Sequence, residues 1–356
     1  MTIATFAIEY HQYLKPDGTL GQALPKDLKP TDLLELYRLM HLLRTFDNRA
    51  LNLQRVGKLG TYAGTLGQEA IGIGMGYAMK KEDVLVPYYR DYGAQYQRGV
   101  SFHKILQYWG GDERGSDFDN AEDFPICVPI ASQSVIATGV ATAIKYRQQK
   151  RAVVTTIGEG GTSEGDFYEA LNVAGAWHLP VVFVVNNNQW AISVSRGQQT
   201  STQTIAQKAI AGGFNGEQVD GNDVIAVYER IRAALEKARR GDGPTLIEAI
   251  TYRLCDHTTA DDASRYRPEA ELKEAWLKEP LIRLRLYLTA QNLWDEAKEE
   301  KLLQECRASI DKDVDIYLNI APAPVTDIVD YMYAKWPHSL QEQRDTLVQF
   351  GRADHD

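Results

Sequence analysis

Cysteine is scarce in this chain, with only Cys127, Cys255 and Cys306 among 356 residues. Their spacing fits neither a zinc motif nor a disulfide framework, so the sequence argues against a cysteine-ligated metal and against a disulfide-stabilised fold. The same scarcity is typical of a reducing compartment, and we expect a cytoplasmic protein.

Long apolar runs and an excess of basic residues are also missing. No stretch is long enough to span a bilayer, so we expect no membrane partner. The first residues, MTIATFAIEYHQY, lack a basic start and a sustained apolar core, and we expect no signal peptide. The net charge of −9 argues against nucleic-acid binding.

The remaining composition is that of an ordinary globular protein, with 44% hydrophobic and 24% charged residues. The length fits two domains or one large α/β domain. Proline and glycine positions divide the chain into an N-terminal arm (1–30), a main domain (31–320) and a C-terminal tail (321–356). An arm that packs on a neighbouring subunit and a frayed terminus are both open for 1–30.

One strand–helix–strand unit dominates the main domain. It reads RAVVTTIGEGGTSEGDFYEALNVAGAWHLPVVFVVNNNQWAIS from Arg151 to Ser193. The β-branched runs Ala152–Ile157 and Val181–Val185 predict strands buried on both faces, and 166–178 predicts the helix between them. This pattern favours an α/β fold with a mostly parallel sheet and helices on both faces. Ligands of such sheets bind at the carboxyl ends of the strands.

Both strands end in residues suited to a phosphate and a metal. Gly158, Gly160 and Gly161 permit close approach of a ligand to the backbone, and a helix N-terminus follows. The loop lacks the third glycine of a dinucleotide motif and the lysine of a Walker A motif. It contains Glu159 instead, and acid beside phosphate calls for a bridging cation such as Mg²⁺. The amide of Asn188, 29 residues later, follows the next strand and is a candidate ligand of the same ion.

The text GEGGTSEGDFYEALN…VVNNNQWAIS resembles the thiamin diphosphate motif, and most closely that of the alpha subunits of the heteromeric, lipoamide-linked 2-oxo acid dehydrogenases. The resemblance covers roughly residues 9 to 345 and implies a thiamin diphosphate-binding fold with a helical C-terminal part. It implies that Glu159, Asn188 and the Trp190 carbonyl bind Mg²⁺, and that Gly160 and Gly161 lie against thiamin diphosphate. Aspartate is the commoner acid in pyruvate members, whereas glutamate occurs in branched-chain members.

Three further segments carry family-like site residues. The resemblance implies that Tyr89 and Arg90, after a strand at 84–87, contact the diphosphate, although a surface Arg90–Asp91 pair is the simpler interpretation. It implies that the backbone at Val128 and Ile130, before a helix rich in small residues, faces the aminopyrimidine ring, and that the Ile130 side chain holds the cofactor bent; core packing is the alternative for Val128. The loop DHTTADDASRYR holds His257, which would contact the cofactor phosphate and assist acyl transfer to a lipoyl group. Many relatives carry a histidine near Tyr108, and this chain has none between His103 and His178.

The scaffold is predicted from apolar spacing. We expect a helix capped by Thr31 and running to about Lys58, close packing at Gly72 and Gly76, and an apolar face formed by Trp276, Leu281, Leu284 and Leu288. Segment 109–125 and segment 196–207 are expected to be loops, the first of them mobile.

The resemblance implies an enzyme that decarboxylates a 2-oxo acid oxidatively and passes the acyl group to a lipoyl-bearing acyltransferase. It implies an α₂β₂ heterotetramer, because a carboxylate needed by the cofactor lies on the beta subunit in this family. Segments such as YAGTLGQEA look most like bacterial pyruvate members. A branched-chain member and a non-catalytic thiamin-fold subunit remain the alternatives.

Overall fold

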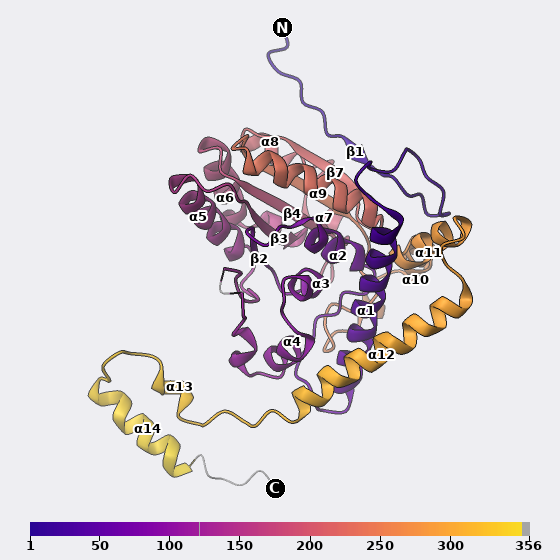
Figure 1. Ribbon diagram of the computed structural model, residues 1–356. Helices are drawn as coiled ribbons and strands as arrows, with labels where there is room; N and C mark the ends of the chain where they lie inside the picture. The colour runs from indigo at the N-terminus through magenta and orange to yellow at the C-terminus, as the bar shows by residue number, and fades with distance from the viewer. Residues whose placement is uncertain (121, 351–356) are drawn as a thin grey trace.

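A six-stranded sheet in which every pair is parallel forms the centre of the molecule (Figure 1). The computed structural model describes residues 1–120 and 122–350. The strands lie in the order β1-β7-β8-β4-β3-β2, so the predicted strand pair is central to the sheet. They are β1 (Tyr10–His11), β2 (Val84–Val86), β3 (Val153–Gly158), β4 (Val181–Asn187), β7 (Gly216–Asp220) and β8 (Thr245–Ile250). A small antiparallel ribbon pairs β5 (Trp190–Ala191) with β6 (Val194–Ser195).

Helices cover both faces of the sheet, which confirms the predicted α/β fold. Side chains alternate along each strand, so Val153 packs on one face and Val154 on the other. The first face packs against α5 (Ser132–Tyr146) and α6 (Gly165–Ala176), and the second against α2 (Glu69–Ala78) and α9 (Val224–Arg239).

Glycines let α2 approach its neighbours closely. A Cβ on Gly76 would lie 2.9 Å from the Cα of Ala94 in α3 (Tyr92–Gln97), and one on Gly74 would lie 2.8 Å from a methyl carbon of Val227. The close packing predicted at Gly76 is therefore confirmed, whereas a Cβ on Gly72 would lie 3.7 Å from its nearest neighbour, which is an ordinary contact.

A second apolar cluster joins the helices beside the sheet. Leu36, Phe46 and Leu284 are among its buried members. Figure 1 shows α12 running alongside α1, and the tail leaving the body beyond it. The helices of this cluster are α1 (Pro30–Arg55), α4 (Phe102–Trp109), α11 (Pro280–Ala290) and α12 (Glu296–Leu318).

The remaining helices are α7 (Arg196–Gln199), α8 (Lys208–Ala211), α10 (Glu269–Trp276), α13 (Asp327–Asp330) and α14 (His338–Phe350), with 3₁₀ turns η1 (Glu113–Ser116), η2 (Gly160–Ser163) and η3 (Ala263–Arg265).

Part of the N-terminal arm belongs to the sheet. Tyr10 and His11 pair with β7, and the N–H groups of Tyr13 and Leu14 each donate to the Asp223 carboxylate at 2.7 Å. Leu14 is fully buried. Residues 10–14 are therefore neither frayed nor free to pack elsewhere, whereas residues 1–7 are exposed. The division into arm, main domain and tail stays a prediction.

Three local predictions are wrong. Helix α1 is capped by Lys29 rather than Thr31, because Pro30 takes the first helical position and the Lys29 N–H donates to the Asp32 carboxylate at 2.8 Å. Trp276 is 39% exposed, unlike the buried leucines predicted to share its face. Segment 196–207 begins with α7. The described part of segment 109–125 is a loop as predicted, apart from the last residue of α4 and the short turn η1, which the Asp112 carboxylate caps; its mobility stays a prediction, and residue 121 lies outside the described residues. None of the described helices is both long and apolar enough to cross a membrane.

Candidate active site

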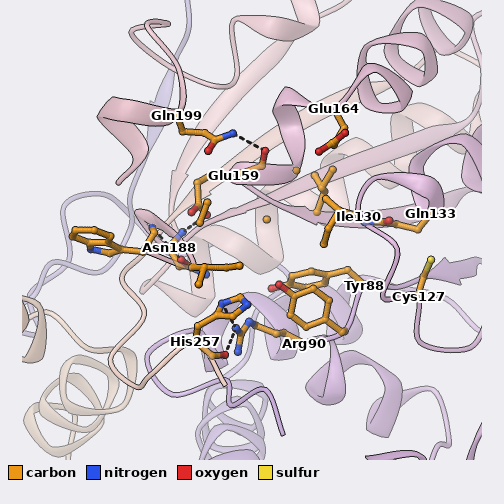
Figure 2. Close-up of a pocket in the computed structure, with 18 residues that line it drawn as sticks. Tyr88, Arg90, Cys127, Ile130, Gln133, Glu159, Glu164, Asn188, Gln199 and His257 are labelled. Carbon is orange, nitrogen blue, oxygen red and sulfur yellow. Dashed lines mark hydrogen bonds between the residues drawn. The ribbon is translucent and has the colours of Figure 1, made fainter. Parts of the chain in front are cut away.

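A cavity of about 270 Å³ lies at the carboxyl ends of β3 and β4 (Figure 2). Val128 is not among the residues that line it, and its side chain is 47% exposed, so core packing is wrong for this residue and the backbone contact stays a prediction. The other predicted site residues all line this cavity: Tyr89, Arg90, Ile130, Glu159, Gly160, Gly161, Asn188, Trp190 and His257.

The glycines after β3 are required by close contacts. A Cβ on Gly160 would lie 2.5 Å from the Cβ of Ala191, and one on Gly161 would lie 2.9 Å from a methyl carbon of Ile130. Any larger residue would push the loop away from the β5–β6 ribbon or from Ile130. At Gly158, by contrast, a Cβ meets nothing within 4 Å.

Glu159 is buried with one carboxylate oxygen unused. Its Oε2 accepts the Asn188 backbone N–H at 3.1 Å, but its Oε1 has no hydrogen-bond partner among the described residues. Burial raises the pKa of this carboxyl from 4.5 to about 7. A buried carboxylate without a full set of partners is costly, and a ligand that fills this position removes the cost.

Asn188 and Trp190 complete a group of oxygens beside Glu159. The Asn188 Oδ1 accepts the Trp190 N–H at 3.3 Å, so the oxygen side of its amide is fixed. The Trp190 carbonyl accepts from Arg253 at 3.0 Å, which uses one of its two lone pairs. One carboxylate, one amide oxygen and one carbonyl oxygen suit Mg²⁺ or Ca²⁺. Within the described residues no three acidic, histidine or cysteine side chains converge on a metal site, so this mixed oxygen set is the candidate.

Two buried arginines lie at His257: Arg90 lines the cavity (Figure 2), and Arg253 contacts the His257 ring from behind the cavity wall. Arg90 donates to the carbonyls of Gly64 and His257, and Arg253 donates to those of Trp190 and Ile192. Arg90 is 4% exposed and Arg253 fully buried, and neither forms a salt bridge with any described residue. Buried cations without anionic partners are unfavourable, so the pair indicates an anionic ligand.

These arginines also fix the protonation of His257. Its Nδ1 lies 3.1 Å from Arg90 and 3.3 Å from Arg253, and both guanidinium groups can only donate. The Nδ1 is therefore the acceptor, and the proton of the neutral ring sits on Nε2. Burial, with the two nearby positive charges, lowers the pKa of His257 to about 3. The ring is neutral at pH 7 and holds an Nε2–H donor.

Arg90 and Asp91 do not form the surface pair considered above. Asp91 is 2% exposed, and its carboxylate accepts from the Tyr88 N–H and the Thr156 hydroxyl rather than from Arg90. Burial raises the pKa of Asp91 to about 7. This acid holds the turn that delivers Tyr88, Tyr89 and Arg90 to the cavity.

The His257 loop is ordered by its own polar residues. The Asp261 carboxylate accepts the His257 N–H at 2.9 Å and also bonds the Tyr266 hydroxyl. Asp262 forms a salt bridge with Arg265 at 3.1 Å, and Arg267 donates to the carbonyls of Arg253 and Cys255.

Sequence reasoning missed three polar residues of the site. Arg253 follows β8 directly, so the strand-end rule that selected Asn188 would have found it. Gln199 donates to the Gly160 carbonyl at 3.0 Å from α7, and no local pattern marks it. Gln68 contacts Asn188 and belongs to the GQEA text, to which no role was assigned.

The residues present fit a diphosphate bridged to a metal ion. Arg90 and the Nε2–H donor of His257, with Arg253 behind them, suit phosphate oxygens, and the unused Glu159 oxygen suits a cation. The glycine loop leaves room for both at the strand ends.

Known proteins resemble this chain over nearly all its length. Residues 37–319 match the family described as "Dehydrogenase E1 component". This chain belongs to the dehydrogenase E1 component family. A relative from Bacillus subtilis, "Pyruvate dehydrogenase E1 component subunit alpha", is 39% identical over 342 residues, or 95% of this chain and 92% of the relative. Proteins of the same name from Staphylococcus aureus and Staphylococcus epidermidis are each 39% identical over 94% of this chain and 91% of theirs.

Membership of this family confirms the predicted resemblance and implies thiamin diphosphate as the cofactor. The mostly parallel sheet with helices on both faces agrees with the thiamin diphosphate-binding fold of E1 alpha chains. Membership does not by itself assign the metal or the role of any residue.

Proposed function

We propose that this chain is the alpha subunit of a pyruvate dehydrogenase E1 component, which decarboxylates pyruvate oxidatively and transfers the acetyl group to a lipoyl group. The observation that carries the proposal is a cavity lined by the buried Arg90, by His257 and by a buried acid with an unused oxygen, with a second buried arginine, Arg253, against His257. The similarity to relatives named for pyruvate supports the choice of substrate.

The residues divide between cation and diphosphate. Glu159, the Asn188 amide oxygen and the second lone pair of the Trp190 carbonyl hold Mg²⁺. Arg90 and the His257 Nε2–H bind diphosphate oxygens, and Arg253 adds positive charge behind them. Thiamin diphosphate, when bound, supplies the electron sink for loss of carbon dioxide.

The remaining predicted contacts position the cofactor. Tyr89 lies under Arg90, with the guanidinium carbon 5.2 Å from the ring centroid, and limits its movement. Gly160 and Gly161 line the cavity, and Ile130 supplies an apolar surface for the cofactor's rings. Val128 contributes through its backbone.

His257 is the catalytic residue of the proposal. An Nε2–H donor stabilises an oxygen that gains negative charge while the acyl group is transferred. Burial and the positive charges of Arg90 and Arg253 keep the ring neutral by lowering its pKa, and bound phosphate would raise the pKa of His257 by offsetting the two charges.

A beta subunit completes the site in this proposal. The cavity is slightly smaller than the usual range of small-molecule sites, which begins at about 300 Å³. Exposed apolar side chains occur at its wall and on the neighbouring α5 and β6: Ile130, Val135, Ile136, Ile192 and Val194. Such a patch is typical of a protein interface. We therefore propose an α₂β₂ assembly that serves a lipoyl-bearing acyltransferase. The free cysteines agree with a cytoplasmic location.

The test is reduction of an acceptor dye by the chain reconstituted with its beta partner, thiamin diphosphate and Mg²⁺. We expect turnover of pyruvate, slower turnover of 3-methyl-2-oxobutanoate, and none from the alpha chain alone. Full activity of the isolated chain would overturn the two-subunit site.

A branched-chain 2-oxo acid dehydrogenase is the second candidate, because the metal position carries glutamate rather than the aspartate commoner in pyruvate members. Preference for 3-methyl-2-oxobutanoate in the same assay would establish it. A stable complex that binds thiamin diphosphate and turns over neither acid would favour another 2-oxo acid or a non-catalytic subunit.

A further inference from the structure

We propose that Gln68 is a positioning residue for the metal site, because its side-chain carbonyl holds the Asn188 amide with the oxygen turned toward the cation. The inference rests on the proposed function, which makes Asn188 a metal ligand. It gives a role to the GQEA segment, none of whose residues is a diphosphate or metal ligand in the proposed function.

The contact itself is buried and directional. The Asn188 Nδ2 donates to the Gln68 Oε1 at 3.0 Å, and both residues are at most 5% exposed. On the opposite side of the amide, Oδ1 accepts the Trp190 N–H. These two hydrogen bonds agree on one orientation, since a reversed Asn188 amide would set its NH₂ against the Trp190 N–H. An asparagine free to rotate would present nitrogen to the metal in part of its population, and that nitrogen cannot bind a cation.

Gln68 is held in place from several directions. Its backbone N–H donates to the Thr65 carbonyl at 2.7 Å, and its own carbonyl accepts from Ile71 at the start of α2. The preceding Gly67 has a φ of +90°, and a Cβ there would lie 2.5 Å from the Tyr252 carbonyl. The Thr251 hydroxyl donates to the Gly67 carbonyl at 2.7 Å. The turn is therefore fixed to the end of β8, beside the end of β4 that carries Asn188.

The other half of the Gln68 amide has no such use. Its Nε2 is buried and has no hydrogen-bond partner among the described residues. Only the acceptor oxygen is engaged, so glutamate at this position retains the contact and methionine removes it. Partners that orient metal ligands typically change metal affinity by about 10- to 100-fold when removed.

The experiment measures Mn²⁺ binding by electron paramagnetic resonance in the reconstituted complex with thiamin diphosphate present. We expect Gln68→Met to weaken Mn²⁺ binding about 10- to 100-fold. We expect Gln68→Glu to stay close to the wild-type affinity. Gln97→Met is the matched control, because Gln97 donates to the carbonyls of Ile73 and Gly93 on α2 and α3, away from the cavity. That variant should lose stability without losing affinity for Mn²⁺.

The outcomes separate the two proposals. A wild-type complex that binds no Mn²⁺ would overturn the metal site, and the role of Gln68 with it. Normal Mn²⁺ affinity in Gln68→Met would overturn the role of Gln68 alone, as would equal losses in Gln68→Met and Gln68→Glu. Should Gln68→Met fail to assemble, Gln68→Asn applies the same test, because its carbonyl is one methylene too short to reach Asn188 and its polarity is retained.

Discussion

Buried acids at the two ends of the central sheet differ in their hydrogen-bond and ion-pair partners. At the amino end, Asp83 is fully buried, and its carboxylate accepts from the N–H groups of Lys80 and Ala152 and from Arg239. At the carboxyl end, Glu159 is as deeply buried, but among the described residues only one of its oxygens has a hydrogen-bond partner and no cationic side chain pairs with it. A buried acid whose oxygens all have partners stabilises the fold. A buried acid with an unsatisfied oxygen destabilises it, and a ligand that binds this oxygen removes the free-energy cost.

The arginines show the same contrast. Arg239 and Arg283 are paired with the carboxylates of Asp83 and Asp220, and both pairs join elements of the scaffold. Arg90 and Arg253, at the cavity, have only carbonyl, hydroxyl and imidazole partners among the residues that the structure describes. Burial alone therefore does not identify a functional residue; the identity of its partners does.

The largest effect on stability is expected from Asp83→Ala. It leaves Arg239 buried without its carboxylate, which costs about 3–5 kcal/mol of unfolding free energy. Urea denaturation of the chain measures this loss, and thiamin diphosphate affinity of the folded complex should not change. Addition of Arg239→Met should restore part of the stability; a single variant as stable as the wild type would contradict the role given to Asp83.

Glu159→Gln should have the opposite profile. We expect Mg²⁺ affinity to fall by about 100-fold or more, because a ligand is lost rather than a residue that orients one. Stability of the ligand-free chain at pH 8 should rise, since a buried ionised group is removed. Isothermal titration and thermal denaturation measure the two quantities. The control is Glu169→Gln, which changes an exposed acid. A loss of stability in Glu159→Gln but not in this control would show that Glu159 stabilises the fold, as Asp83 does.

The pH dependence of stability and of metal binding should report the burial of Glu159. The folded-state pKa of Glu159, about 7, lies above its ordinary value of 4.5. Its contribution to stability is therefore present below about pH 4.5 and is lost as the pH rises through 7. Metal binding needs the ionised form, so Mg²⁺ affinity should fall about tenfold per pH unit below 7. Titrations between pH 5.5 and 8 measure this, and affinity that does not vary with pH would show that Glu159 is ionised without metal.

The smallest effect is expected at the rim of the site. Arg265 and Asp262 form a salt bridge of 3.1 Å with both side chains largely exposed. Arg265→Ala should change the unfolding free energy by no more than about 0.5 kcal/mol, because water and salt screen exposed pairs. Pyruvate turnover should also stay unchanged. A large loss of turnover would mean that this pair contacts a partner in the assembly.

Much of the site was predictable because its residues follow the ends of predicted strands. The β-branched runs at Val153 and Val181 mark buried parallel strands, and Glu159 and Asn188 follow them in the chain. His257 and Arg90 were predicted from the resemblance of their segments to those of the family. Gln68 reaches the site from the N-terminal end of α2, and Gln199 from α7. No periodicity in their own segments shows where those helices lie relative to the site.

The sequence by itself determined the alternation of strands and helices, the glycine loop and the polar residues at strand ends, because these depend on local propensity and period. Only the tertiary structure decided which charges are paired. Asp83 precedes a buried strand and Glu159 follows one within the glycine loop, but the neighbouring residues of neither acid show whether an arginine pairs with it. Arg239 reaches Asp83 from 156 residues away, and no described arginine or lysine pairs with Glu159. Ion pairing depends on distances of a few ångströms between segments far apart in the chain, and only the packed fold sets those distances.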